Sequence, residues 1–356
     1  MAFTTIDDPS AYFKVQLYTG NGSDNHAITF DDTDTDMQPN LVWIRNRDAI
    51  DHTCMFDTNR GATEFLYTNE ISGGRAEIDD DDTLDSFTSD GFQVDDDDRV
   101  NTNTEKYVSW NWKGGTTSGI NATGADITPS SYSFSQDAGI SVLLYTGNGS
   151  ADQQVAHGLA AIPDLMLVKS VSSNDDWIVF HKNMDTADPE DYTMSIGTTG
   201  ARSNASYPWN DTMPTSVLFT VNNSDSGNKS GGEMVNYCFT GKQGFSKFGS
   251  YEGNGNANGP FVYLGFRPAW LMIKRTDDTG KWIIMDSKRL GYNLSNKVLY
   301  ANVDNAEESA STALYSNGFK VRETWDAVNA NTGEFIYAAF AEFPIVSSND
   351  VPTVAR

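Results

Sequence analysis

Short apolar runs, four to seven residues long, follow one another along the whole chain and are separated by Gly, Asn, Asp, Ser and Pro. The runs are rich in β-branched and aromatic residues, which favour strands over helices. The stretches 165–168 and 283–285 are apolar throughout, which predicts strands buried on both faces. The stretch 108–112 alternates, which predicts one core face and one wet face. The pattern therefore predicts an all-β protein.

The pattern repeats three times. Tyr18-Thr-Gly-Asn-Gly-Ser23 returns unchanged at 145–150 and in altered form at 251–255. After each copy comes a proline-led apolar run with a basic residue six positions on (45−39, 169−163 and 274−268). A second apolar run begins 14 positions after each proline (53−39, 177−163 and 282−268). Because Asn-Gly favours the positive φ of tight turns, we expect the Gly-Asn-Gly strings to be hairpin tips.

The repeat sets the expected domain organisation. We expect three tandem antiparallel β-sandwich-like modules of about 105 residues, a common domain size. Residues 114–137 are rich in Gly, Ser and Thr, which predicts a flexible tether between modules 1 and 2. Modules 2 and 3 are expected to abut. The predicted ranges are 1–113 (module 1), 114–137 (linker), 138–242 (module 2), 243–345 (module 3) and 346–356 (C-terminal tail).

Charge and composition narrow the classes of partner. The net charge of −25 repels nucleic acid and anionic membrane, so neither is expected as a partner. No segment has the eighteen or so apolar residues of a membrane span, and no signal peptide is recognised. We therefore expect synthesis in a cytoplasm without standard secretion. Cys54 and Cys238 lie on apolar strands of different modules, which predicts two buried free thiols.

Runs of aspartate in module 1 are the candidates for a metal site. Asp32, Asp34 and Asp36 have the spacing that begins an EF-hand loop, and calcium prefers oxygen ligands. Met37 then stands where that loop needs glycine, and Trp43 where it needs the bidentate glutamate. The runs have no counterparts in modules 2 and 3. Solvated loop charge is the favoured interpretation, and no cofactor other than calcium is expected.

Some ionisable residues recur between modules. Asp57 and Asp286 stand at equivalent positions, each with an arginine three residues later, and His181 takes this place in module 2. A carboxylate kept in two copies could be catalytic, but an Asp–Arg pair that holds a turn is the favoured interpretation.

The glutamates that precede the last strands offer a second catalytic reading, because paired carboxylates can cleave glycosides. The sequence supplies no partner carboxylate at a defined place, so a turn or strand-edge role is favoured. The four histidines show no metal-ligand spacing. Three aromatic residues are candidates for stacking on sugars, or alternatively for the core. The residues in question are Glu105, Glu233 and Glu334, and Tyr132, Tyr207 and Trp209.

Several strings together resemble a repeated module in structural proteins of marine tailed phages, including viruses of cyanobacteria. They are the opening Ala2-Phe-Thr-Thr-Ile-Asp-Asp-Pro9, the Tyr-Thr-Gly-Asn-Gly-Ser string, Met37-Gln-Pro-Asn-Leu-Val-Trp-Ile44, Ser89-Asp-Gly-Phe92 and Tyr107-Val-Ser-Trp-Asn-Trp-Lys113. The resemblance covers roughly residues 1–345. It implies a non-enzymatic virion component on the particle surface, such as a tail fibre, a tail-tip adhesin or a head-decorating protein.

The resemblance also implies partners and a location. Other virion proteins would be the partners, with a host cell-surface glycan or receptor as a further one, and a homotrimer is expected because such appendages are symmetric oligomers. The virion would be assembled in the host cytoplasm and then exposed to the medium. Two alternatives stay open: a glycan-binding or glycan-cleaving protein, suggested by the recurring aromatic and glutamate positions, and a calcium-dependent adhesin, suggested by the aspartate runs.

Overall fold

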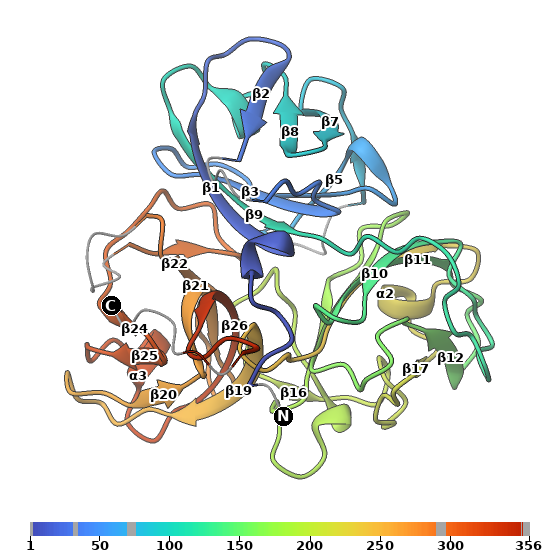
Figure 1. Ribbon diagram of the computed structural model, residues 1–356. Coiled ribbons are helices and arrows are strands. Elements are labelled where there is room, and N and C mark those ends of the chain that lie inside the picture. The colour runs from blue at the N-terminus through green and yellow to red at the C-terminus, as the bar shows by residue number, and fades with distance from the viewer. Residues whose placement is uncertain (1–2, 31–34, 70–75, 290–296, 350, 352–356) are drawn as a thin grey trace.

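The computed structural model describes residues 3–30, 35–69, 76–289, 297–349 and 351. Three β-modules surround a common centre (Figure 1), with module 1 in blue at the top, module 2 in green and yellow, and module 3 in orange and red. In each module one large antiparallel sheet faces a smaller one, so the protein is all-β and sandwich-like.

Module 1 has a six-stranded sheet in the order β1-β9-β3-β4-β5-β6 and a three-stranded sheet in the order β2-β8-β7. Its elements are η1 (Pro9–Ala11), β1 (Phe13–Thr19), β2 (His26–Thr29), β3 (Leu41–Asn46), β4 (Cys54–Asp57), β5 (Gly61–Tyr67), β6 (Ile78–Asp79), β7 (Leu84–Thr88), β8 (Gly91–Val94), α1 (Asp98–Asn101) and β9 (Lys106–Trp112).

Module 2 has a five-stranded sheet in the order β10-β11-β18-β13-β14 and the strand pairs β12-β17 and β15-β16. Its elements are β10 (Ser131–Ser135), β11 (Ile140–Thr146), β12 (Gln153–Ala156), β13 (Leu165–Ser170), β14 (Ile178–His181), η2 (Pro189–Asp191), β15 (Tyr192–Thr193), β16 (Ser203–Asn204), β17 (Leu218–Val221), α2 (Asp225–Asn228) and β18 (Glu233–Phe239).

Module 3 has a five-stranded sheet in the order β19-β26-β21-β22-β23 and a three-stranded sheet in the order β20-β25-β24. Its elements are β19 (Ser246–Glu252), β20 (Phe261–Tyr263), β21 (Phe266–Arg275), β22 (Ile283–Asp286), β23 (Leu299–Tyr300), β24 (Thr312–Tyr315), β25 (Gly318–Val321), α3 (Asp326–Asn329) and β26 (Glu334–Pro344).

The last strand of each module lies inside its large sheet, and both of its faces are buried. One face of β9, β18 or β26 covers the module's own interior, and the other turns to the centre of the molecule. The predicted wet face of 108–112 is therefore wrong, because Ser109 and Asn111 are fully buried within module 1. The prediction that 165–168 and 283–285 are buried on both faces is confirmed.

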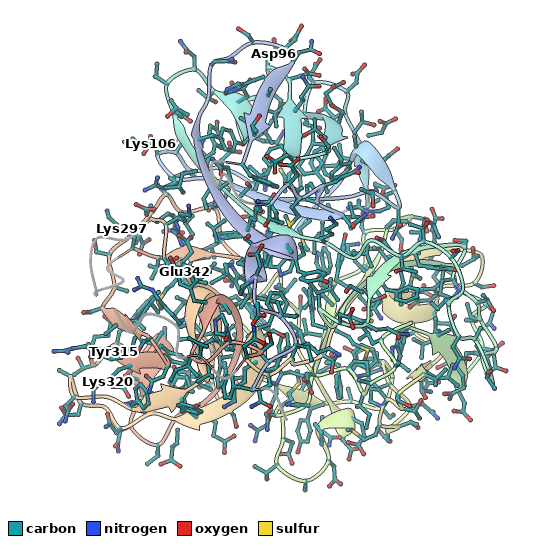
Figure 2. The ribbon with its side chains drawn as sticks, viewed as in Figure 1. Asp96, Lys106, Lys297, Tyr315, Lys320 and Glu342 are labelled. Carbon is teal, nitrogen blue, oxygen red and sulfur yellow. The ribbon has the colours of Figure 1, made fainter. Side chains whose placement is uncertain are left out.

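Aromatic side chains from all three modules meet at the centre. Trp112, Phe239 and Phe340 occupy equivalent places at the inner ends of β9, β18 and β26. Their ring centroids form a triangle with sides of 6.2, 5.7 and 5.8 Å. Such contacts stabilise beyond the area that they bury. Figure 2 shows side chains filling this centre, while the labelled Asp96 lies at the far tip of module 1.

The expected tether between modules 1 and 2 is wrong. Residues 131–135 form β10, which pairs with β11, and Thr116 bridges to Phe134. Ile127 forms a further bridge to Val155. The central core draws residues from all three modules, so the modules pack together. Composition indicated a flexible connector, but strand pairing and packing order this segment. The module boundaries themselves stay a prediction.

The Gly-Asn-Gly strings are not hairpin tips. The strand before each string and the strand after it belong to different sheets, so each string crosses between the two layers of a module. A fully buried asparagine holds each crossing: the Asn101 Oδ1 accepts from the Asn21 amide at 2.9 Å, and its Nδ2 donates to the Ser23 carbonyl at 3.0 Å. Asn228 and Asn329 repeat both contacts.

The two cysteines are buried and free, as predicted. Cys54 packs in the interior of module 1 and Cys238 in that of module 2. Burial raises the pKa of both thiols well above the ordinary value, which keeps them protonated and unreactive.

Candidate functional site

The recurring polar residues gather at the three interfaces between modules. At each interface one backbone amide donates to the carbonyl eight positions after the proline of the next module. This contact joins module 1 to 2, module 2 to 3 and module 3 to 1. The pairs are Glu77 to Val171 at 2.8 Å, Arg202 to Thr276 at 2.9 Å and Glu307 to Arg47 at 2.9 Å. The modules therefore form a closed head-to-tail ring within one chain.

A charged group at the end of β4 receives a side chain from module 2. We call the end of the β4, β14 or β22 strand, with the residue three positions later, the socket of its module. In the module 1 socket the Arg60 Nε donates to the Asp57 Oδ2 at 2.6 Å, and the Tyr237 hydroxyl donates to the same oxygen at 2.8 Å. Arg60 also donates to Glu77 at 2.8 Å.

Burial by itself would lower the pKa of Arg60, but the neighbouring Asp57 outweighs it and raises that pKa above its usual range. Burial likewise raises the pKa of Tyr237 well above its usual value. The socket therefore holds an ion pair with a neutral phenol that donates to it. The favoured interpretation of Asp57, a partner for the arginine that holds a turn, agrees with this geometry, although the contact to module 2 was not foreseen.

The module 3 socket repeats this arrangement with a residue from module 1. The Arg289 Nε donates to the Asp286 Oδ2 at 2.5 Å, and the Trp110 Nε1 donates to the same oxygen at 3.1 Å. Arg289 also reaches Glu307 at 3.3 Å. Trp110 and Tyr237 stand at the same register position on β9 and β18, which we call the key position.

The module 2 socket reverses the direction of the hydrogen bond. The key position of module 3 is Ala338, whose side chain has no donor. His181 replaces the aspartate, and its Nε2 lies 3.2 Å from the Tyr337 carbonyl, beside Ala338. Because a carbonyl only accepts, Nε2 must be the protonated nitrogen. Burial lowers the pKa of His181 to about 3, so the ring is neutral at ordinary pH.

A tryptophan at the start of the second apolar run makes another inter-module contact. The Trp177 Nε1 donates to the Tyr67 carbonyl at 2.9 Å, and the Trp282 Nε1 donates to the Ser195 carbonyl at 3.0 Å. Module 1 has Thr53 at this place, and its neighbour Thr68 donates to the Ala301 carbonyl at 2.7 Å instead. Each interface is thus closed by related but different side chains.

The basic residue six positions after each proline is fully buried. Arg45 donates to the Asn305 carbonyl at 2.5 Å, and Lys274 lies 3.4 Å from the Thr199 carbonyl, so each reaches into the preceding module of the ring. Lys169 donates to the Ser173 carbonyl at 2.9 Å. Burial lowers the pKa of Arg45 to about 10 and those of both lysines to about 8.

The three glutamates do not form a paired site. Strand register makes Lys106 the equivalent of Glu233 and Glu334, so Glu105 lies one residue out of step. Glu105 accepts from the Asn46 side chain at 2.6 Å, and Glu334 pairs with Arg202. Both contacts lie at the start of a last strand, as the turn or strand-edge reading expected, and the contact of Glu334 also crosses from module 3 to module 2.

The calcium candidates are only partly within the described residues. Asp32 and Asp34 lie outside them, and Asp36 is exposed. Another aspartate run brings one oxygen each from Asp80, Asp81 and Asp82 within 4.8 Å of one another. Asp80 is already paired with Arg99. Solvated charge explains such a cluster without an ion.

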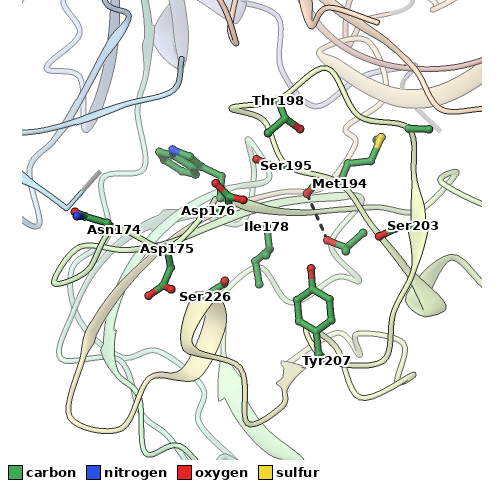
Figure 3. Close-up of a pocket in the computed structure, with 13 residues that line it drawn as sticks. Asn174, Asp175, Asp176, Ile178, Met194, Ser195, Thr198, Ser203, Tyr207 and Ser226 are labelled. Carbon is green, nitrogen blue, oxygen red and sulfur yellow. Dashed lines mark hydrogen bonds between the residues drawn. The ribbon is translucent and has the colours of Figure 1, made fainter. Parts of the chain in front are cut away.

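A polar hollow of about 400 Å³ opens in module 2. Its lining includes Asp175, Asp176, Ser226 and Tyr207, and Figure 3 shows Ile178 between Asp175 and the Tyr207 ring. Tyr207 is 46% exposed, and its pKa is raised by partial burial and by Asp176. The hollow therefore combines an accessible aromatic face with carboxylate and hydroxyl groups.

The other two aromatic candidates, Tyr132 and Trp209, differ in their exposure to solvent. Tyr132 lies at the edge of a separate hollow of about 550 Å³ between modules 1 and 2. Trp209 is 1% exposed and packs against Phe180, so it belongs to the core of module 2.

Comparison with known proteins gives one family. The profile of a domain of unknown function, DUF7483, matches residues 8–344, which include all three modules. The chain belongs to the DUF7483 family. No curated protein and no solved structure matches the chain. Among the described residues no helix is long and apolar enough to cross a membrane.

Two features of this DUF7483 chain were missed by sequence reasoning. The buried Asn101, Asn228 and Asn329 each precede the first equivalent residue of the last strand by five positions (106−101, 233−228 and 334−329), a regularity that was visible in the sequence. The inter-module contacts had no such signal, because nothing in a sequence repeat tells which module touches which.

Proposed function

We propose that the protein is a non-enzymatic structural component of a tailed-phage virion, a tail-fibre or tail-tip adhesin or a head-decorating protein. The observation that carries the proposal is the use made of the recurring ionisable residues. Asp57, Asp286 and His181 are committed to holding one module against the next. Their repetition is therefore explained by assembly of a rigid ring.

The shape and charge support a compact surface component over an elongated fibre. The three modules close on each other around one core. The net charge of −25 favours a soluble, strongly hydrated surface in a saline medium. The resemblance to modules of marine phage proteins is the ground for proposing a phage virion as the location. It also supports assembly in the host cytoplasm and other virion proteins as partners.

The proposal is tested on particles. Gradient-purified virions from the virus that encodes this chain are digested and analysed by mass spectrometry, and intact particles are labelled with antibody and gold for electron microscopy. We expect peptides of the chain at a fixed ratio to the capsid protein, and label at one location on the particle. Protein found in the lysate but missing from purified particles would sink the proposal.

Homotrimer formation is a separate proposal. The threefold head-to-tail contact that three chains would make is already present inside one chain. A homotrimer would therefore use outer surfaces of the ring. Light scattering on the purified protein distinguishes a particle of three chains from one of the single-chain mass of 39.0 kDa.

A second candidate function is glycan binding at the hollow of module 2. The exposed ring of Tyr207 can stack on a sugar face. The nearby carboxylates and hydroxyls can form hydrogen bonds with the hydroxyl groups of the sugar. We expect Tyr207→Ala to abolish binding on a glycan array. Tyr263→Ala, at a residue of module 3 that is 50% exposed, should leave it unchanged. An array on which the wild type binds nothing removes this candidate.

A further inference from the structure

The first strand of module 1 has an open side. β1 is the outermost strand of its sheet. The Tyr12 carbonyl accepts from Lys113, and the Gly20 amide donates to Glu105, both toward the β9 side. Because backbone groups alternate along an antiparallel strand, those of Phe13 and Val15 point away from β9. Within the part of the chain that the structure describes, no strand pairs with that side.

The equivalent strand of module 2 is covered. Tyr18 and Tyr145 align β1 with β11, so Phe13 corresponds to Ile140 and Val15 to Val142. β10 pairs with β11 here, placing Ser135 opposite Ile140 and Ser133 opposite Val142 (Figure 1). The segment that supplies β10 lies between modules 1 and 2. At the same distance before β1, residues 4–8 form no strand and do not pair with β1.

A groove of about 510 Å³ lies where β10 would be. It is lined by residues 13–16 of β1, by residues 7, 8 and 10 of the segment before β1 and, from module 3, by Ala269, Ser287 and Lys288. Phe343 is 54% exposed at the rim. In Figure 2 the labelled Glu342, another lining residue, lies between modules 1 and 3.

The opposite wall is equivalent as well. Ala269, Ser287 and Lys288 occupy the positions that Asn40, Thr58 and Asn59 occupy at the interface of modules 1 and 2. There Asn59 contacts β10, because its Oδ1 accepts from the Ser131 hydroxyl at 3.3 Å. The hollow at that interface lies beyond β10, against Ser131 and Tyr132. The two interfaces thus differ by one strand.

We propose that the groove between β1 and module 3 is a binding slot for an extended segment of another polypeptide, which adds to the sheet antiparallel to β1. This mode of recognition takes its affinity from main-chain hydrogen bonds and its specificity from alternate side chains. The partner residues opposite Phe13 and Val15 are small, because they face Ala269 and Ser287 as the serines of β10 face module 1. The slot stands on the fold alone and does not depend on the virion proposal.

Lys14 makes the slot selective. Its side chain is almost fully buried, contacts the Thr35 carbonyl and lies 3.9 Å from Asp90. An inward-pointing charge on an edge strand discourages indiscriminate pairing. The partner must therefore place opposite Lys14 a side chain that can pack against the aliphatic part of the lysine, as an aromatic ring does. Phe134 is the residue of β10 at that place.

The test uses the full-length protein and a synthetic peptide with the sequence of residues 129–136. Amide hydrogen exchange is measured residue by residue with and without the peptide. In the free protein the amides of Phe13 and Val15 should exchange faster than their covered equivalents Ile140 and Val142. Saturating peptide should slow Phe13 and Val15 on the order of tenfold or more and leave the β11 amides unchanged. No change at Phe13 and Val15 at millimolar peptide overturns the proposal.

Matched control peptides separate strand addition from mere adhesion. N-methylation at the positions of Ser133 and Ser135 removes amides that would face β1 and should abolish the protection. N-methylation at the position of Phe134, whose amide bonds Thr116 in the chain, should preserve it. Equal binding by both peptides overturns the proposal. Protection of β1 that depends on protein concentration without peptide also overturns it, in favour of a second copy as the occupant.

Discussion

The aspartate sockets of modules 1 and 3 and the histidine socket of module 2 stand at equivalent places, yet their hydrogen bonds run in opposite directions. Asp57 and Asp286 accept from Tyr237 and Trp110, while His181 donates to a backbone carbonyl beside Ala338. The difference teaches that the socket follows its key. Ala338 has no side-chain donor, so a carboxylate at position 181 would be buried without this partner. The neutral His181 stands there instead and donates to a carbonyl.

The largest expected effect comes from emptying an aspartate socket. Asp57→Ala leaves the guanidinium of Arg60, whose side chain is 1% exposed, with the partly exposed Glu77 as its remaining carboxylate partner. Removing one member of a buried pair costs about 3–5 kcal/mol of the free energy of unfolding. Denaturant titration followed by tryptophan fluorescence measures the loss.

A double variant serves as its control. Asp57→Leu combined with Arg60→Met removes both charges and should recover most of the stability, because apolar replacement of an ion pair is often neutral. A double variant as unstable as Asp57→Ala would show that the charges themselves are not the cause.

Placing the wrong group in the module 2 socket should be nearly as harmful. His181→Asp directs a carboxylate at the Tyr337 carbonyl, with Met184 where the other sockets have arginine. We expect a loss of roughly 3 kcal/mol at neutral pH from an unpaired buried charge. Adding Met184→Arg should return part of it. Thermal unfolding of the two variants and the wild type makes the comparison, and a harmless single variant would contradict the matching of socket to key.

Removing a key donor should cost less. Tyr237→Phe keeps the ring packed but takes one hydrogen bond from Asp57, which Arg60 still holds at 2.6 Å. A hydrogen bond to a charged group contributes about 1.5–3 kcal/mol, and the remaining ion pair should keep the loss at the lower end. Tyr337→Phe is the matched control, because the equivalent contact there uses the Tyr337 carbonyl. Equal losses of unfolding free energy in the two variants would show that the Tyr237 hydroxyl does not stabilise the interface through Asp57.

The most gradual expected effect is a slope of the free energy of unfolding with pH. Burial lowers the pKa of His181 to about 3 and that of His157 to about 4, below the unfolded value of 6.5. The unfolded chain therefore binds the proton more tightly, so stability is full above pH 6.5 and falls as the pH drops. Each histidine contributes about 1.4 kcal/mol per pH unit until its folded pKa is reached.

His181→Gln isolates the socket, since an amide can still donate to the carbonyl. Between pH 6.5 and 5 the wild type should lose about 2 kcal/mol relative to this variant. Denaturation at several pH values gives the difference. Parallel curves would mean that His181 is not held neutral in the folded protein.

The sequence predicted the parts of the fold that depend on local pattern. The all-β class, the threefold repeat and the buried thiols of Cys54 and Cys238 follow from apolar runs and spacing, and all are found. The predicted wet face at 108–112 failed because a strand between two cores cannot be told from alternation alone. The tether failed because the Ser-rich strand β10 is ordered by its neighbours.

The candidate site could be predicted only in part. Asp57, Asp286 and His181 were identified as equivalent positions from spacing, and a structural role was favoured. Their partners in other modules could not be foreseen, since Tyr237 contacts Asp57 across 180 residues of sequence. Long-range contacts depend on how whole modules dock, and the three interfaces use different donors. The groove beside β1 was equally invisible, because it exists only between two modules.

The two ends of the described fold are tied together, since Ser348 donates to the Asp7 carboxylate at 2.6 Å across 341 positions. The order of the modules along the chain is therefore almost arbitrary for the ring. A circular permutant that joins these ends and opens the chain at Gly119, where the Cβ of another residue would meet nothing, should rebuild all three interfaces. The polypeptide is linear, but its architecture is cyclic.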